Sequence, residues 1–228
     1  MGGTRRWCRA PALLVLLLVV GDACSSGAKR DTAASRPTAR PATTTADPTT
    51  STAAAPCGPS TTVAGGGGGG PEVNPPGDIP DNQAFVTFTP PSGGYSVQVP
   101  EGWARTDGPH GVSFTDKFNT VRIELEPTAS APTVASATST EVPAITAVAR
   151  CYEPGKVTTV VRKGGTAVLI TYQADAAPDP VTGKVVRDDV ERYEFWRGGT
   201  EAVVTLSGAA GSDNVDPWRL VTDSFTWR

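Results

Sequence analysis

The stretch Gly94-Tyr-Ser-Val-Gln-Val-Pro-Glu-Gly-Trp103 decides the fold expected for this chain. Apolar and polar residues alternate from Tyr95 to Val99, which is the period-2 pattern of a half-buried β-strand. Pro100 ends the strand because it lacks the N–H that a ladder requires, and Gly102 permits the positive φ of a turn. Trp103 then supplies a large apolar anchor that is able to fold back over the strand. The stretch carries no catalytic or metal-binding constellation.

Composition divides the chain at about residue 80. Thr, Ala, Pro and Gly dominate before that point, whereas most aromatic residues follow it. Of the 228 residues, about 148 remain for a folded domain at 81–228, which is enough for one hydrophobic core. The formal net charge is -3, and removal of residues 1–23 leaves 17 basic and 22 acidic residues, a net charge of -5. A mildly acidic protein lacks the basic footprint of a nucleic-acid-binding protein, so no nucleic-acid partner is expected.

The N-terminus has the organisation of an export signal. Arg5, Arg6 and Arg9 precede an apolar run from Ala10 to Gly21. That run is too short to cross a hydrocarbon layer of roughly 30 Å as a helix. Residues 1–23 are therefore predicted to be a signal peptide that is removed, and the arginine pair leaves both Sec and twin-arginine export open.

Cys24 follows the apolar run within Gly21-Asp-Ala-Cys-Ser-Ser-Gly27. This segment resembles a bacterial lipoprotein signal, in which a small residue precedes a cysteine that is lipidated and becomes the new N-terminus. The resemblance implies a lipid anchor on Cys24, with palmitate among its acyl chains, and an extracytoplasmic location at the cell membrane. Gly21 and Asp22 depart from the pattern. Small residues at 21 and 23 also suit ordinary signal-peptidase cleavage, which gives a secreted protein as the alternative.

Residues 24–80 are predicted to be a disordered tether. The segment has threonine runs, six glycines at Gly65–Gly70 and four prolines after them, without apolar periodicity. It cannot bury enough apolar surface to offset its ordering entropy. As a flexible coil, some 56 residues would hold the domain roughly 40 Å from the anchor. The glycines are not followed by the Lys and Ser/Thr of a P-loop, so no nucleotide site is expected.

The domain is expected to be built on an antiparallel sheet. Patterns of alternation and turn residues predict strands at 85–89, 95–99, 112–115 and 120–126, with a loop at 105–111. Two hairpins follow, 157–161 with 167–172 and 185–196 with 202–206. Both hairpin turns combine a basic residue, Gly-Gly and Thr.

Two helical segments complete the prediction. The first, Thr133–Arg150, lacks strand alternation and begins at Thr133 as a possible N-cap, and Pro143 is expected to divide it. Its apolar residues lie near helical spacing: Val134, Ala137, Val142, Ile145 and Val148. The second is expected to be capped by Asp216, with Pro217 at its first position. Its apolar face is Trp218, Val221 and Phe225, and Trp227 is expected in a last short strand or at the core edge.

With these residues in place, the chain resembles the PsbP-like superfamily over roughly residues 84–228. The resemblance rests on Gly94–Trp103, Phe114-Thr-Asp116, Asn119-Thr-Val121, the Gly-Gly hairpins and Asp223-Ser-Phe-Thr-Trp227. Within bacteria the chain is most similar to the actinobacterial LpqN-like lipoproteins. The resemblance implies an α+β fold, an α/β/α sandwich around a central antiparallel β-sheet. The structural signature is Tyr95, Pro100, Trp103, Trp218 and Phe225. Members include a photosystem II subunit and a Ran-binding import factor, so the resemblance implies no activity.

Candidate catalytic and metal-binding residues are few. His110 is the only histidine and has no assembled nucleophile or acid beside it, so it is interpreted as a solvated loop residue. One histidine and scattered cysteines do not make zinc-ligand spacing. Five acidic residues near the loop 174–184 lack EF-hand spacing and are interpreted as a solvated rim rather than a Ca²⁺ site. They are Asp175, Asp179, Asp188, Asp189 and Glu191. No catalytic residue, cofactor or metal is predicted.

Cys57 and Cys151 remain once Cys8 leaves with the signal peptide and Cys24 is assigned to the lipid. Outside the cytoplasm, two such thiols are able to form a disulfide, which would pin the distal tether near a loop at 152–155. Because Cys57 lies in a segment expected to be flexible, two free thiols are the alternative.

Two functional hypotheses follow from the sequence. The first is a non-catalytic binding or assembly module in the cell envelope, anchored through its N-terminal lipid, with an unknown envelope protein or ligand as partner. The second is an enzyme that acts on an envelope polymer with an Asp/Glu acid and base. Two carboxylates that face one another in a deep cleft, one with a raised pKa, would favour the second hypothesis.

Overall fold

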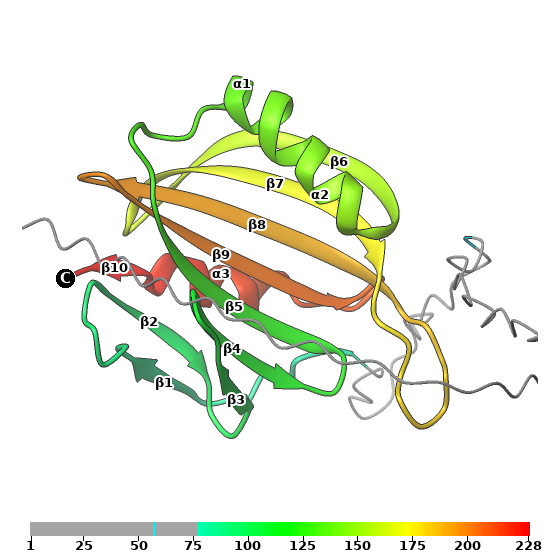
Figure 1. Ribbon diagram of the computed structural model, residues 1–228. Coiled ribbons are helices and arrows are strands. Elements are labelled where there is room, and N and C mark those ends of the chain that lie inside the picture. The colour runs from blue at the N-terminus through cyan, green and yellow to red at the C-terminus, as the bar shows by residue number, and fades with distance from the viewer. Residues whose placement is uncertain (1–56, 58–76) are drawn as a thin grey trace, which may run out of the picture. The chain divides into compact units, whose positions relative to one another are not determined.

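The computed structural model describes Cys57 and residues 77–228, which lie in one compact unit spanning 53–228. Its largest element is a seven-stranded antiparallel sheet (Figure 1). In spatial order the strands are β3 (Ala104–Asp107), β4 (Gly111–Asp116), β5 (Asn119–Pro127), β9 (Thr200–Ala209), β8 (Arg187–Arg197), β7 (Gly165–Asp175) and β6 (Arg150–Arg162). A three-stranded antiparallel sheet has the order β1 (Phe85–Phe88), β2 (Tyr95–Pro100) and β10 (Thr226–Trp227). The described chain is thus mostly antiparallel sheet with few helices.

The strand predicted from the opening stretch is β2, in the middle of the smaller sheet. Tyr95, Val97 and Val99 are all at most 2% exposed, as their alternation predicts. Pro100 still belongs to the strand, where it lies opposite Phe85, and the chain then turns. Gly102 in that turn has φ +82°, the left-handed conformation that glycine adopts without strain.

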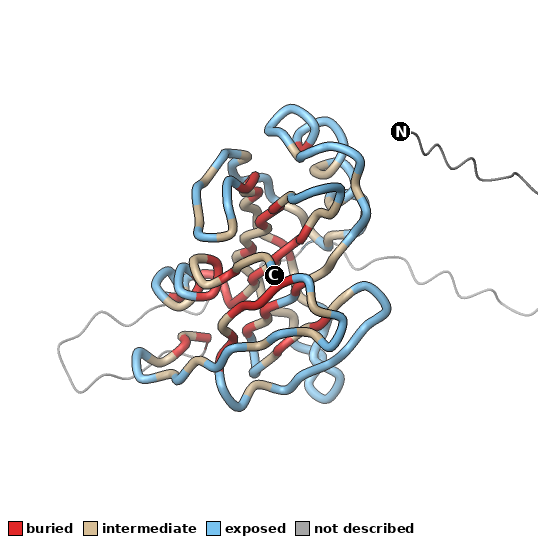
Figure 2. The backbone as a smooth tube through the Cα atoms, turned by 90° about the vertical axis from the view of Figure 1, so that its left-hand side faces the viewer, coloured by how far each residue is buried: buried red, intermediate tan, exposed pale blue. Residues whose placement is uncertain are grey.

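The two faces of the large sheet carry different covers. Along β7, Ala167 and Leu169 face the main core, which contains β2 and α3 (Val215–Ser224). Val168 and Ile170 alternate with them and face the helical segment on the other side. That segment comprises α1 (Val134–Ser136), a π-helical turn η1 (Ala137–Glu141) and α2 (Val142–Val148), and Figure 1 shows it over β6 and β7. In Figure 2 the buried residues lie in the middle of the domain, and exposed loops surround them.

Two strands depart furthest from the prediction. The expected loop at 105–111 contains strand β3, whose four residues are all exposed, so no apolar alternation marks it in the sequence. Strand β6 begins at Arg150 instead of 157 and includes the expected loop at 152–155. Its pairing with β7 is interrupted on either side of Glu153 and Pro154, which disturbs the period-2 pattern. Proline is tolerated there because β6 is an edge strand.

The observed helix ends agree with the predicted ones only in part. Thr133 is the N-cap of α1, as predicted, and its side chain accepts a hydrogen bond from the N–H of Ser136 (3.0 Å). The long element changes from π to α helix at Val142, so Pro143 lies in the first turn of α2, where a missing N–H is harmless. Helix α3 begins at Val215 after Asn214, two residues before the predicted first position at Pro217.

The folded domain starts before residue 81, contrary to the predicted boundary of the tether. Ile79 is buried in the main core, and its N–H donates to Asn214 Oδ1 (2.8 Å). The side chains of Asn214 and Asn119 both donate to the carbonyl of Gly77 (3.0 and 2.9 Å). These bonds give a buried amide network that fixes residues 77–79. The sequence does not reveal them because they join residues more than 40 positions apart.

Cys57 and Cys151 form a disulfide bond across 94 positions of the sequence. Cys151 lies at the start of β6 with φ +49°, and its carbonyl accepts a hydrogen bond from Arg187. Arg187 is also paired with Asp175 (3.2 Å) and Glu153 (3.0 Å), so the attachment point is held by an ionic cluster. The predicted signal peptide, Cys24 and, apart from Cys57, the rest of the tether up to residue 76 lie outside the described residues. In the described part, no helix has the length and apolar character needed to cross a membrane.

Candidate functional site

The larger candidate site is a groove between α2 and the open face of the sheet, named here the α2-face groove. It has a volume of about 590 Å³. Its floor includes a row of opposed residues across four strands, Thr120, Ser207, Val190 and Tyr172. Its wall is the apolar side of α2, with Ile145 and Val148. Val148 shares the helical spacing of the apolar residues on this segment, yet it is 82% exposed and leaves an apolar side chain in the groove.

A second row of the floor carries two of the arginines that line the groove. Arg122, Thr205 and Arg192 lie opposite one another on β5, β9 and β8. Arg192 pairs with Glu141 (3.3 Å) and with Glu194 (3.1 Å). Glu141 is the last residue of the π-helical turn, a local structure that is frequent at functional sites. The turn thus brings a helix carboxylate onto the strand arginine.

Glu194 is a buried carboxylate beside this groove. It is 0% exposed, and its Oε2 has no hydrogen-bond partner within the described residues. Burial raises the pKa of Glu194 to about 7, and the neighbouring Arg192 guanidinium opposes the rise. A buried carboxylate with one unbonded oxygen is costly when charged, so Glu194 takes up a proton readily in the folded protein.

The raised pKa of Glu194 predicts that stability falls as the pH rises. Below pH 4.5 the group is protonated in both states, whereas between 4.5 and about 7 only the unfolded chain ionises. The free energy of unfolding therefore falls by up to about 3 kcal/mol as the pH rises from 4.5 through about 7. We expect Glu194→Gln to remove this loss, which is measurable by denaturant unfolding of both proteins at pH 5 and pH 8. A variant that shifts stability equally at both pH values would contradict the linkage.

A second perturbed carboxylate lies at the end of the α2-face groove nearest the disulfide. Burial raises the pKa of Asp188 to about 7, and the negative charges of Asp189 and Asp175 act in the same direction. Asp175 also lines the groove, and its carboxylate is paired with Arg187. One groove end therefore combines a carboxyl group that is half protonated near neutral pH with an ion-paired one.

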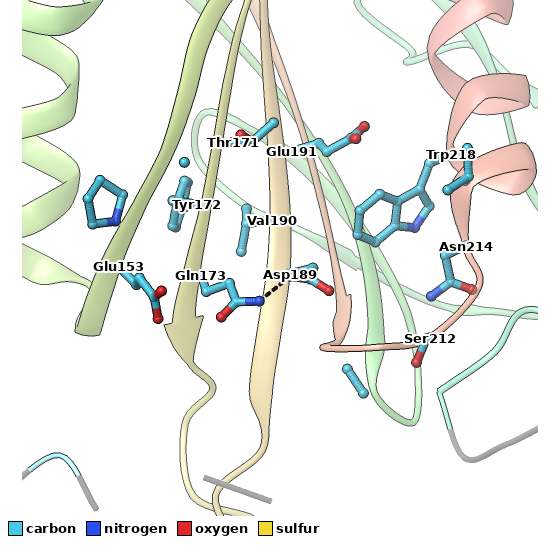
Figure 3. Close-up of a pocket in the computed structure, with 14 residues that line it drawn as sticks. Glu153, Thr171, Tyr172, Gln173, Asp189, Val190, Glu191, Ser212, Asn214 and Trp218 are labelled. Carbon is cyan, nitrogen blue, oxygen red and sulfur yellow. Dashed lines mark hydrogen bonds between the residues drawn. The ribbon is translucent and has the colours of Figure 1, made fainter. Parts of the chain in front are cut away.

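A smaller groove lies on the opposite face of the sheet, beside α3, and Figure 3 shows its lining. Its volume is about 440 Å³. Asp189 accepts hydrogen bonds from Gln173 Nε2 (2.7 Å) and from the N–H of Gly211 (3.2 Å). Glu191 accepts from the Tyr193 hydroxyl (2.7 Å), and Trp218 closes the far side. The carboxylates of Asp189 and Glu191 therefore already accept hydrogen bonds from groups of the protein itself.

The acidic residues predicted to crowd around one loop are dispersed by the sheet. Asp188 faces the α2-face groove, whereas Asp189 and Glu191 line the groove beside α3, because successive side chains of a strand point to opposite faces. Asp179 is exposed, and hydrogen bonds from Thr182 and Val181 lower the pKa of its carboxyl. Within residues 77–228 no three His, Cys, Asp or Glu side chains are grouped to hold a metal ion.

The other residues singled out from the sequence lie in the core or in an exposed turn. Tyr95, Trp218 and Phe225 belong to the buried main core, and Trp103 packs against it. His110 is exposed in the turn between β3 and β4, and its imidazole makes no hydrogen bond to any described residue. The sequence did not single out Arg192 and Glu194. Their only signal was a strand, 185–196, with charged residues on both faces.

Comparisons with known proteins give likenesses of structure alone. No protein-family model and no curated protein matches the chain. A solved protein from Bacteroides thetaiotaomicron is similar at 15% identity over 62% of this chain, with a TM-score of 0.42. This chain spans about half of that protein's length, 48%. The cyanobacterial PsbP of Synechocystis sp. PCC 6803 is similar at 17% identity, over 72% of this chain and 98% of that one, with a TM-score of 0.45. Nothing about activity, substrate or partner follows from either likeness.

Proposed function

We propose that this protein is an exported lipoprotein, anchored to the cell membrane through Cys24, whose domain is a non-catalytic binding or assembly module of the envelope. The sequence features that support export are the arginines, the apolar run and the cysteine that ends it. The proposal includes membership of the LpqN-like lipoproteins and their α/β/α sandwich. Helical cover on both faces of the large sheet supports that architecture.

The α2-face groove is the single observation that carries the binding role. It is large and open, with apolar groups of α2 on one side and charged strand residues, both arginines and aspartates, on the other, and ligand sites commonly combine apolar surface with a few charged groups. Val148 leaves an apolar side chain in solvent at its mouth. Such a surface is stabilised when a partner covers it.

The perturbed carboxylates favour binding over acid–base chemistry. Asp188 and Glu194 lie six residues apart on the same face of β8, which corresponds to about 20 Å. Two carboxylates that cleave a glycosidic bond lie roughly 5 to 9.5 Å apart. These two groups therefore cannot act on one bond.

In-cell photocrosslinking tests the groove. A photoreactive residue replaces Val148, which is 82% exposed in the groove, or as a matched control Val161, which is 75% exposed on β6 and lines neither groove. We expect one defined envelope crosslink from position 148 and none from 161. Equal crosslinking from both positions would contradict the proposed site.

The anchoring part of the proposal has its own test. We expect Cys24→Ala to move the protein from the membrane fraction to the medium or the soluble envelope fraction, and to abolish labelling with a fatty-acid probe. Wild-type protein that is recovered without lipid, cleaved after Ala23, would support the secreted alternative instead.

An enzyme acting on an envelope polymer remains the second candidate because Asp188 and Asp175 line one end of the same groove. Asp188 would be the general acid, since burial raises its pKa to about 7, and Asp175, which is ion-paired with Arg187, would be the second carboxylate. Release of reducing ends from cell-wall polysaccharide, lost in Asp188→Asn, would establish this role. Absence of turnover by the wild-type protein would contradict the enzymatic role and favour the binding module.

A further inference from the structure

A third cavity, the Tyr95 pocket, lies where the turn after β1 meets the turn between β3 and β4. Its volume is about 340 Å³, and it lies beside the strand that the sequence singled out. Leu125, on its floor, packs against the main core, so the pocket opens on the face of the large sheet opposite the α2-face groove. The pocket is therefore separate from the proposed envelope-partner site.

Backbone hydrogen bonds fix both turns that form the walls. The N–H of Gly93 donates to the carbonyl of Pro90 (2.9 Å), and the N–H of Gly108 donates to that of Gly111 (2.8 Å). The N–H of Leu125 donates to the carbonyl of His110 (3.0 Å), which ties the second turn to β5. The cavity is thus preformed, which lowers the entropic cost of binding.

The walls of the pocket combine apolar and polar surface in about equal parts. Phe88 packs edge-on against Phe114, with ring centroids 5.2 Å apart, and tilts against Tyr95 at 6.3 Å. Pro90 and Leu125 complete the apolar lining. A small apolar body would replace water against these surfaces.

Polar side chains of the pocket include the Tyr95 hydroxyl, the pair Arg105 and Asp107, and also Ser92 and His110. Tyr95 is 2% exposed, yet its hydroxyl has no hydrogen-bond partner within the described residues. Burial raises the pKa of Tyr95 to about 12, with Arg105 lowering and Asp107 raising it, so the hydroxyl keeps its proton and lies near both charges. The Tyr95 side chain lines the pocket, so its hydroxyl is available to donate to a ligand acceptor.

Arg105 and Asp107 supply a fixed donor and a fixed acceptor. The Nε and Nη2 of Arg105 both donate to Asp107 Oδ1 (3.0 and 2.6 Å), and the guanidinium lies over the Phe88 ring at 4.8 Å. Three guanidinium N–H groups and Asp107 Oδ2 remain without hydrogen bonds to the described residues. Because the pair is neutral as a whole, it gives no net attraction to an anion and suits a neutral ligand that both accepts and donates hydrogen bonds.

We propose that the Tyr95 pocket binds a neutral amide on a small apolar body, as a hydrophobic residue of a polypeptide partner presents it. The amide carbonyl accepts from the Tyr95 hydroxyl and Arg105, and the amide N–H donates to Asp107. The apolar body packs against Phe88, Pro90 and Leu125.

An NMR titration of the exported chain tests this proposal with N-acetyl-L-leucinamide as the probe. We expect shifts confined to the amides of Tyr95, Gly111 and Leu125. Tyr95→Phe deletes only the unpartnered hydroxyl, so it should leave folding intact and weaken binding about fivefold. Tyr152→Phe, a half-buried tyrosine outside the pocket, is the control and should bind as the wild type does.

Three results would overturn the proposal. They are no binding at tens of millimolar probe, unchanged binding by Tyr95→Phe, and tighter binding of the anionic N-acetyl-L-leucine than of the amide. The third result would assign the pocket to carboxylates instead. None of them bears on the α2-face groove, so the proposed function is tested independently.

Discussion

Replacing Phe225 with alanine is expected to lower the free energy of unfolding by about 4 kcal/mol. Phe225 is 0% exposed and joins both sheets. Its ring stacks on Phe195 of the large sheet (centroids 4.7 Å apart) and on Tyr95 of the small one (5.6 Å). The edge of Trp227 meets it at 5.3 Å. Truncation removes all three aromatic contacts and leaves a cavity at their centre.

The surroundings of Phe225 leave little room to close that cavity. A Cβ atom on Gly164, in the β6–β7 turn, would lie 2.6 Å from Phe225 Cδ1, so the hairpin already lies directly on the ring. Equilibrium unfolding in urea measures the loss. Phe118→Ala is the matched control, because Phe118 is 39% exposed in a turn and should cost less than about 1 kcal/mol. Equal effects of the two substitutions would show that Phe225 is not central to the core.

Strands with one buried face could be predicted well from the sequence. In β2 and β5 the apolar side chains alternate because one face of each strand packs against the core, and both strands lie within a residue or so of the predicted ranges. The Gly-Gly hairpins were also placed correctly, with turns between Arg162 and Gly165 and between Arg197 and Thr200. In these elements local pattern and tertiary burial agree.

The errors occur where long-range contacts override local pattern. Strand β3 is fully exposed and is held only by its pairing with β4, so its residues carry no apolar signal. Ile79 belongs to the core because Asn214, far away in the sequence, binds its backbone. The composition of a Pro- and Gly-rich segment cannot reveal such a contact.

The candidate grooves were the least predictable part. Glu194 is buried and Val148 is exposed, and both outcomes depend on how the helical segment packs over the sheet. Neither feature is local. The sequence indicated charged residues on both faces of a long strand, but only the fold distinguishes Asp188 in one groove from Asp189 in the other.

Loss of the Cys57–Cys151 disulfide is expected to lower the free energy of unfolding by about 4 kcal/mol. The bond closes a loop of 94 positions, and in the chain-entropy model a loop of that size restricts the unfolded state by about this amount. Cys57→Ser is the suitable variant because Cys57 is exposed, whereas Cys151 has a left-handed backbone conformation. For a domain of this size the melting temperature should fall by about 10 °C.

Reduction of the wild-type protein is the internal control for that variant. Dithiothreitol should lower wild-type stability to the level of Cys57→Ser and leave the variant unchanged, whereas Cys24→Ser should match the wild type under both conditions. An unchanged midpoint for Cys57→Ser would contradict the stabilising role of the bond.

The bond also decides where a membrane tether would leave the domain. With the disulfide closed, the chain from Cys24 reaches the domain after 33 residues, at Cys151. As a flexible coil this corresponds to roughly 30 Å, compared with roughly 40 Å for the full tether. Cys151 lies between Arg150, which lines the α2-face groove, and Glu153, which lines the groove beside α3. In a protein anchored through Cys24, as proposed, the disulfide would place this end of both grooves near the anchor. Cys57→Ser should then weaken the Val148 crosslink if the partner is embedded in the membrane.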